Sequence, residues 1–287
     1  MLKIENLYKS FEDFPVLYGL NWEIKEKEIM GLVGVNGSGK STLLRCISEV
    51  YDRSKGQILF DGVRIEDKKD KLTFISDEPF YFSRFSTKEM KNFYKSFYKS
   101  FDEKEYSRLL QVFDLDENKP IHQFSKGLKR QSALVLGLAC QTELLMMDES
   151  FDGLDPKARL TLKREMVRSV QDKNMSIIIS THNIREIEDI ADRIALLKNG
   201  QISLSKSLDD LDLEYHKVQV GYSEAPDPEI FKSWDALSLE ISGKIVTVIY
   251  KGESLMEEIE KTHPILINPL DINMEEILVT EMEDKYE

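Results

Sequence analysis

The chain has 287 residues, enough for one large domain, or one large and one small, around a well-buried core. Charged residues make up 32% of it and apolar residues 41%, and no apolar run reaches the roughly 18 residues of a membrane-spanning helix. The first residues mix charges with apolar side chains, which excludes a signal peptide. We therefore expect a cytoplasmic protein that reaches a membrane only through a partner.

The net charge of −13 lies in the C-terminal part of the chain. Residues 205–287 contain 20 acidic and 7 basic side chains, whereas residues 1–204 contain 32 of each. This shift predicts two domains with a boundary near Ser205, the second of them small and acidic. The neutral and acidic balances of the two parts disfavour nucleic acid as a partner.

The N-terminal half predicts two kinds of sheet. The first 25 residues alternate like half-buried antiparallel strands, with Leu2, Ile4 and Asn6 on one face. Short apolar runs separated by helical patterns then predict a buried parallel sheet with crossover helices. These runs cover residues 29–33, 72–75, 144–147 and 177–179. A hairpin is predicted around the Asn199-Gly200 turn.

Residues 86–140 have helical patterns, with a stripe of large side chains at spacings of three and four. The stripe comprises Met90, Phe93, Tyr94, Phe97, Tyr98 and Phe101. We interpret it as a face packed inside the domain, and docking of a partner helix is the alternative. Residues 205–287 predict a small α+β domain. Its expected elements are strands at 217–222, 237–241, 245–250 and 265–267 and helices at 255–260 and 274–282.

The strongest chemical signal is the run Gly34-Val-Asn-Gly-Ser-Gly-Lys-Ser-Thr42, which fits the phosphate-loop pattern G-x-x-x-x-G-K-[ST] between an apolar strand and an amphipathic helix. Backbone amides of such a loop converge on phosphate oxygens at a helix N-terminus. Lys40 is expected to reach the β- and γ-phosphates, and Ser41 to offer its hydroxyl to Mg²⁺. The residues assigned to ATP binding are Gly34, Val35, Asn36, Gly37, Ser38, Gly39, Lys40, Ser41 and Thr42.

Two carboxylates, Asp148 and Glu149, follow the apolar run 144–147 directly. Asp148 suits a magnesium contact, and Glu149 suits the general base that polarises an attacking water. A third segment, Phe124-Ser-Lys-Gly-Leu-Lys-Arg-Gln131, precedes an apolar helix, with Ser125 as a good N-cap. Alone, this segment predicts a capped helix and nothing more.

Together these motifs resemble an ABC ATPase nucleotide-binding domain over residues 1–204, in the family's order from the aromatic A-loop to the H-switch. The resemblance implies an α/β P-loop NTPase fold with a RecA-like core, an antiparallel β subdomain and a helical subdomain. Here a small C-terminal α+β domain over 205–287 follows it. In that family two domains close head to tail around two ATP molecules.

The resemblance also implies roles for single residues. Phe11 would stack on adenine with Val16 beside it, and Ser125 and Gly127 would contact the γ-phosphate of the ATP held by the opposite subunit. Asp155 would end the D-loop, Asp152-Gly-Leu-Asp155, which couples the two ATP sites.

In the switch, Ser180-Thr-His182, the last residue would contact the γ-phosphate and position water with Glu149.

Three positions depart from the family pattern. The signature reads Phe-Ser-Lys-Gly-Leu and resembles that of ABC-2-type exporter ATPases. Asp77 stands where the Q-loop carries glutamine, and we assign it a contact to Mg²⁺ or its water. Ser150 replaces the proline that follows the catalytic glutamate and leaves that loop less constrained.

The resemblance implies the ATP-hydrolysing subunit of an ABC exporter, with ATP and Mg²⁺ as cofactors, at the inner face of the cell membrane. ATP would close a dimer and power a separate integral membrane permease. We expect a homodimer because both halves of the composite site occur in this chain; a paralogous partner is the alternative. A soluble ABC ATPase acting on ribosomes or DNA, and an ATP-gated regulatory module without transport, are the other functions considered.

Overall fold

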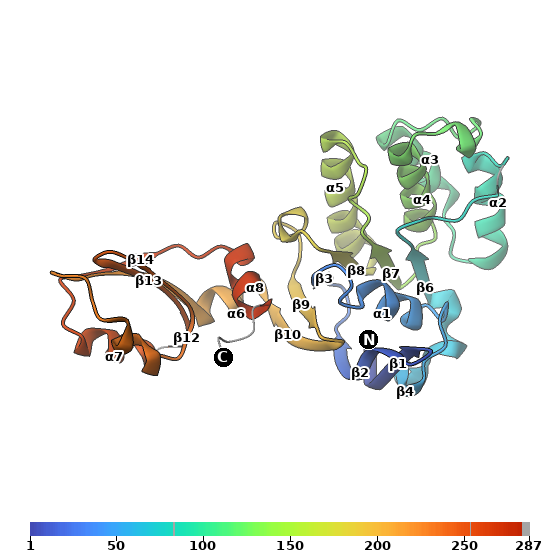
Figure 1. Cartoon of the computed structure of the whole chain (residues 1–287). Coiled ribbons are helices and arrows are strands. Elements are labelled where there is room, and N and C mark those ends of the chain that lie inside the picture. Colours follow the sequence, from blue (N-terminus) through green and yellow to red (C-terminus); the bar gives the residue numbers. More distant parts are fainter. Residues whose placement is uncertain (83, 253, 283–287) are drawn as a thin grey trace. The chain divides into compact units, whose positions relative to one another are not determined.

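The computed structural model describes residues 1–82, 84–252 and 254–282 and divides into two compact units, residues 1–205 and 206–287 (Figure 1). The first unit contains a sheet of order β2-β1-β4-β5 and a second sheet of order β10-β9-β3-β8-β7-β6. Its strands are β1 (Leu2–Phe11), β2 (Phe14–Ile24), β3 (Ile29–Val33), β4 (Lys55–Phe60), β5 (Val63–Arg64), β6 (Leu72–Ile75), β7 (Leu144–Asp148), β8 (Ser176–Thr181), β9 (Arg193–Lys198) and β10 (Gln201–Ser207). Its helices are α1 (Lys40–Ile47), α2 (Thr87–Phe97), α3 (Glu103–Val112), α4 (Lys126–Ala139) and α5 (Pro156–Lys173).

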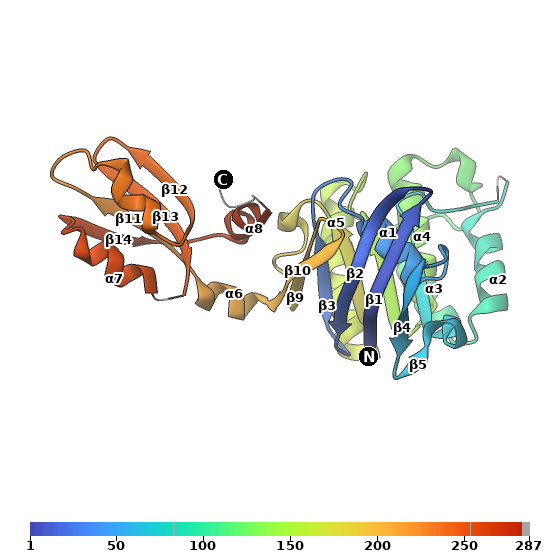
Figure 2. The ribbon, with the colours of Figure 1, turned by 60° about the horizontal axis from the view of Figure 1, so that its bottom comes forward.

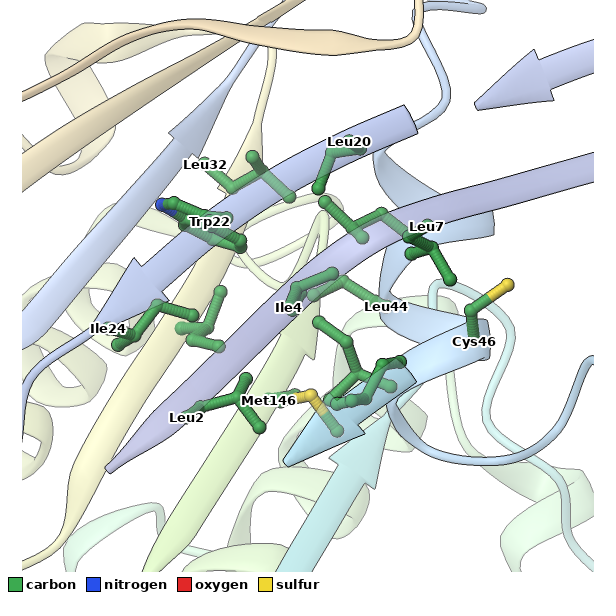
Figure 3. Close-up of a cluster of buried hydrophobic side chains, with 14 of the residues drawn as sticks. Leu2, Ile4, Leu7, Leu20, Trp22, Ile24, Leu32, Leu44, Cys46 and Met146 are labelled. Carbon is green, nitrogen blue, oxygen red and sulfur yellow. The ribbon is translucent and has the colours of Figure 1, made fainter. Parts of the chain in front are cut away.

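The two sheets enclose helix α1. Strands β6, β7, β8, β3 and β9 are parallel, as the continuous apolar runs predict, while β1 pairs antiparallel with β2 and β4. Figure 2 shows β1, β2 and β4 lying across α1. Leu2 and Ile4 of β1, Leu44 and Cys46 of α1, and Met146 of β7 are fully buried in one shared core (Figure 3). This confirms the α/β P-loop fold.

The first strand departs from the predicted alternation at Asn6. Asn6 was expected on the inner face with Leu2 and Ile4, but it is exposed and has a φ of 49°, so it does not belong to the core. The register shifts between Ile4 and Leu7, so that Leu7 is buried instead. A β-bulge therefore moves the inward side of the strand by one residue, which alternation alone does not reveal.

The turn between β9 and β10 confirms the predicted hairpin. Asn199 and Gly200 both have positive φ, 49° and 70°, as a two-residue type I′ turn requires. The sequence analysis did not predict β4 and β5, which extend the antiparallel sheet.

Helices α2, α3 and α4 begin at side-chain caps. Ser86 and Glu89 form a capping box at α2, Asp102 caps α3, and Ser125 caps α4 by accepting the N–H of Leu128. The aromatic stripe lies on and after α2, and it is not uniformly packed inside the unit. Met90 is 1% exposed, whereas Phe97 is 62% exposed.

The second unit is an antiparallel sheet of order β12-β13-β11-β14. Its elements are α6 (Leu208–Glu214), β11 (Tyr215–Gly221), β12 (Ala236–Ser242), β13 (Ile245–Lys251), α7 (Ser254–Lys261), β14 (Leu266–Leu270) and α8 (Met274–Met282). A short 3₁₀ helix (Pro228–Ser233) between β11 and β12 gives the strand–helix–strand–strand–helix–strand order of a ferredoxin-like sheet. Val218 and Val248 of the sheet and Ile259 of α7 share its core.

Candidate active site at the phosphate loop

The loop between β3 and α1 forms one wall of a cavity of about 420 Å³. Gly39 opens α1 with a φ of 106°, a conformation that glycine adopts without strain. A Cβ on Gly34 would lie 2.6 Å from the Leu197 carbonyl, so the loop also depends on glycine for its close approach to β9. The cavity is lined by Val16, Asn36, Gly37, Gly39, Lys40, Ser41, Thr42, Glu149, Asp152 and His182.

Lys40 is the buried cation of this cavity. Its side chain is 5% exposed, and Nζ donates hydrogen bonds to the carbonyls of Gly34 at 2.7 Å and Val35 at 3.2 Å. Nζ also lies 3.6 Å from Oε1 of Glu149. Burial lowers the pKa of Lys40, and the nearby Glu149 carboxylate opposes that shift. A desolvated ammonium of this kind interacts strongly with an anion such as a phosphate.

Asp148 ends β7 in a fully buried position. One carboxylate oxygen, Oδ1, accepts a hydrogen bond of 2.5 Å from the Ser180 hydroxyl, while Oδ2 has no partner among the described residues. A buried carboxylate oxygen without a partner is costly unless an ion or water satisfies it. Oxygen donors of this type suit Mg²⁺, and the Ser41 hydroxyl beside the cavity is of the same type. The residues present therefore fit a magnesium ion.

Glu149 and His182 meet because β7 and β8 are parallel neighbours that end at the same edge of the sheet. Oε2 of Glu149 lies 2.9 Å from Nδ1 of His182. Glu149 has a φ of 45°, a rare conformation for a residue with a side chain, and its N–H donates to the Ser180 carbonyl at 3.1 Å. Strained backbone of this kind is typical of functional positions, and here it aims the carboxylate into the cavity.

Three other predicted residues, Ser125, Gly127 and Asp155, are not among those that line this cavity. Ser125 is exposed at the start of α4, and a Cβ on Gly127 would lie 2.6 Å from the Gly153 carbonyl. Asp155 caps α5, where its carboxylate accepts the N–H of Ala158 at 2.9 Å. The signature thus adjoins the D-loop at Gly153, and of these two segments only Asp152 is among the residues that line the phosphate-loop cavity.

The predicted adenine platform lies at the tip of β1. The ring of Phe11 is 40% exposed and meets Tyr51 edge to face, with ring centroids 5.3 Å apart. Lys9 places Nζ 4.8 Å from the Phe11 centroid. Val16, by contrast, lines the cavity directly, with its side chain facing Gly39.

Asp77, which was expected to contact Mg²⁺ or its water, lies beside an arginine. Its carboxylate forms an ion pair with Arg45, and Asp77 is not among the residues that line the cavity. Sequence reasoning placed Asp152 in the D-loop and Ser180 in the switch segment, but it did not predict that Asp152 lines the cavity or that Ser180 donates a hydrogen bond to Asp148. The signal available for Ser180 was a hydroxyl directly after one strand of the predicted parallel sheet, the sheet that also contains the strand preceding Asp148.

Comparisons with known proteins give matches along the whole chain. The family model described as "ABC transporter" matches residues 17–152. The chain is 30% identical to the ABC transporter ATP-binding protein YtrB of Bacillus subtilis, over 99% of both proteins. It is 32% identical to the lantibiotic transport ATP-binding protein SrtF of Streptococcus pyogenes, over 73% of this chain and 92% of SrtF.

A solved structure described as "Structure of ATP binding subunit of ABC transporter" has a TM-score of 0.68 at 27% identity, over 74% of this chain and 92% of that one. Similarity also extends to the phosphonates import ATP-binding protein PhnC of Wolinella succinogenes, 29% identical over 74% of this chain and 85% of PhnC. Among the residues that the structure describes, no helix combines the length and apolar character needed to cross a membrane.

Proposed function

The chain belongs to the ABC transporter ATP-binding proteins, which hydrolyse ATP to power transport, and we propose that this member drives export through a separate membrane permease. ATP closes two copies of the chain head to tail, and hydrolysis lets them open. The observation that carries the proposed dimer is that the residues assigned to ATP lie in two separate places on the chain. Lys40, Glu149 and His182 line one cavity, whereas Ser125 belongs to a helix end outside that lining.

Within the cavity, Lys40, Glu149 and His182 have separate tasks. Lys40 binds the β- and γ-phosphates. A phosphate that draws Lys40 toward itself leaves the Glu149 carboxylate to accept a proton from the attacking water. His182 holds that carboxylate in place through the 2.9 Å contact. Mg²⁺ held by Asp148 and Ser41 would neutralise negative charge on the phosphates.

Ser125 and Gly127 complete the site of the second copy. The start of α4 presents a hydroxyl and backbone amides at the positive end of a helix, an arrangement that binds phosphate. Since this chain has both a phosphate loop and a signature helix, a two-fold axis would bring Ser125 of each copy to Lys40 of the other. A homodimer of this kind contains two complete ATP sites.

The permease docks, in this proposal, in an apolar groove beside residues 76–81. The groove has a volume of about 480 Å³, and Phe80 and Phe97, which line it, are 69% and 62% exposed. Exposed rings around a concave surface are typical of interaction sites. An amphipathic helix from a cytoplasmic permease loop would cover these rings with its apolar face. The other lining residues are Lys69, Asp70, Thr73, Phe74, Ile75, Ser76, Pro79, Met90, Phe93, Tyr94, Tyr98 and Ala133.

Export is proposed from two observations. The signature Phe-Ser-Lys-Gly-Leu resembles that of ABC-2-type exporters, and the similar protein SrtF is a lantibiotic transport protein. PhnC, named as an import protein, is similar over a comparable share of this chain, so similarity of the ATP-binding domain alone does not indicate the direction of transport.

The first experiment uses Glu149→Gln to trap the closed dimer. The tagged variant is purified with ATP and Mg²⁺ from detergent-solubilised membranes of its own host, and a multi-spanning permease should be retained with it. A dimer recovered only from the soluble fraction would contradict a transport role. Direction is then tested with the wild-type complex in inside-out vesicles, where export predicts ATP-dependent accumulation of substrate in the lumen and import predicts its loss from loaded vesicles.

A further inference from the structure

Asp77 occupies the place of the Q-loop glutamine, yet its carboxylate is engaged by an arginine. Nη2 of Arg45 lies 2.8 Å from Oδ1 of Asp77, within a charge-assisted hydrogen bond. Neither Asp77 nor Asp148, the other predicted metal contact, is among the residues that line the cavity, but Asp148 has a buried carboxylate oxygen without a partner among the described residues, whereas the Asp77 side chain is 41% exposed. Asp77 is therefore paired with a cationic side chain, whereas Asp148 has an oxygen available to a metal ion.

Arg45 links Asp77 to the nucleotide side of the unit. It lies on α1, just over one turn after Lys40. Its Nη1 also donates to the Tyr51 hydroxyl at 3.3 Å, and Tyr51 meets the ring of Phe11 edge to face. Arg45 thus touches the Q-loop on one side and the aromatic pair beside the predicted adenine platform on the other.

A second arginine holds the main chain at the same point. Arg130 of α4 is 3% exposed and donates to the carbonyls of Ser76, at 2.7 Å, and Asp77. The Tyr81 hydroxyl donates to the Lys129 carbonyl of the same helix. The loop of residues 76–81 is therefore attached at both its ends to the helix that begins at Ser125.

We propose that Asp77 is a positioning residue, whose ion pair with Arg45 fastens the loop of residues 76–81 to α1 while Arg130 fastens the same loop to α4. Since α1 begins at the phosphate loop and α4 at the signature, residues 76–81 connect the two helices whose N-termini are assigned to ATP binding. Ser76 and Phe80 also line the apolar groove. The step from this link to permease control rests on the proposed function, whereas the link itself does not.

The test compares Asp77→Asn, Arg45→Gln and the exchanged pair Arg45→Asp with Asp77→Arg in the full-length chain. Amide hydrogen exchange is measured without added nucleotide over residues 76–81 and the first turn of α4. Each single variant should exchange about fivefold faster there, the scale of one partly exposed ion pair, and the exchanged pair should restore protection. Glu143→Gln, which removes the similarly exposed Lys71–Glu143 ion pair, is the control and should leave these amides unchanged.

A second readout separates positioning from metal binding. The Mg²⁺ concentration that half-saturates ATPase activity should be the same in Asp77→Asn, Arg45→Gln and wild type, while kcat falls alike in the two single variants and recovers in the exchanged pair. If Asp77→Asn alone raises that Mg²⁺ concentration by about tenfold, Asp77 is a metal ligand and the proposal is wrong. Unchanged amide exchange in Asp77→Asn would overturn it equally. Failure to retain a permease, with the exchange results intact, would remove only the exporter assignment.

Discussion

Helices α1 and α4 both start at short glycine-containing segments, and the start of any helix favours negative charge, yet the surroundings of these two helix ends differ. The α1 end is surrounded by Lys40, Glu149 and His182, which line one cavity. The α4 end has Ser125 exposed, and its nearest close neighbour is the Gly153 segment. The first end thus lies beside candidate catalytic side chains, whereas the second lies beside none of the residues that line that cavity. This difference is the reason for the dimer proposed above.

The largest effect is expected at the α1 end, from Glu149→Gln. Loss of the general base should lower kcat by about 100-fold or more. Asp152, the other carboxylate among the described residues that line the cavity, does not have the contact to His182 that Glu149 has, so it should not replace the base. ATP binding should persist, and the closed dimer should accumulate. Steady-state ATPase assays check the first point and size-exclusion chromatography with ATP the second. Glu143→Gln, at an exposed carboxylate, serves as control, and a kcat within tenfold of wild type would assign the base elsewhere.

At the α4 end, Ser125→Ala should lower ATP turnover by about tenfold, because a hydrogen bond to a charged phosphate is lost. ATP affinity of the single chain should not change, since Ser125 lies outside the cavity lining. Ser86→Ala is a matched control: it removes the cap of α2 and should cost a similar stability of about 1 kcal/mol while sparing turnover. Thermal unfolding of both variants measures the stability that each has lost. If turnover falls equally in both, Ser125 acts only as a helix cap.

Ser180→Ala tests the support beneath the α1 site. The variant leaves Oδ1 of the buried Asp148 without its 2.5 Å partner, so we expect unfolding free energy to fall by about 1–3 kcal/mol. Denaturant unfolding measures this loss. Ser203→Ala, at an exposed residue of β10 whose hydroxyl donates to the Leu196 carbonyl at 3.3 Å, should change stability less. Equal losses would show that the Ser180–Asp148 contact contributes nothing particular to the site.

The smallest effect on basal hydrolysis is expected from Phe80→Ala, because this ring is exposed in the groove and is not among the residues lining the nucleotide cavity. Transport should be lost while ATPase activity of the chain alone stays within twofold of wild type, as a docking contact requires. Phe14→Ala removes a more exposed ring of β2 outside the groove and should affect neither. Basal ATPase that collapses with transport would contradict docking at this surface.

The α1 site was largely predictable because its parts are contiguous or fixed by parallel strands. Residues 34–42 form one local motif, and a buried parallel sheet places the residues after β7 and β8 at one edge. The metal role assigned to Asp77 stays a prediction, whereas its ion pair with Arg45 was not predictable, because it joins residues 32 positions apart. The contact from Arg130 to the Ser76 carbonyl likewise spans 54 positions. Such contacts depend on tertiary packing and leave no local pattern.

Smaller differences have the same cause. The β-bulge at Asn6 depends on pairing with β2 and β4, and β4 and β5 form in a segment whose alternation is weak. The exposure of Phe97 on α2 depends on how α2 packs, which the stripe of aromatic residues does not specify. The assignments of single residues to ATP contacts stay predictions that the variants above test.

The central claim, that α4 of one copy completes the ATP site of another, is tested most directly by mixing two defective chains. Both carry Glu149→Gln, so that closed dimers persist; one also carries Lys40→Ala, the other Ser125→Arg, and only the first is tagged. Neither should dimerise alone. A mixed dimer has one intact site, Lys40 from the second chain with Ser125 from the first, so ATP should retain the untagged chain on the tag. No ATP-dependent retention, under conditions in which Glu149→Gln alone dimerises, would contradict the claim.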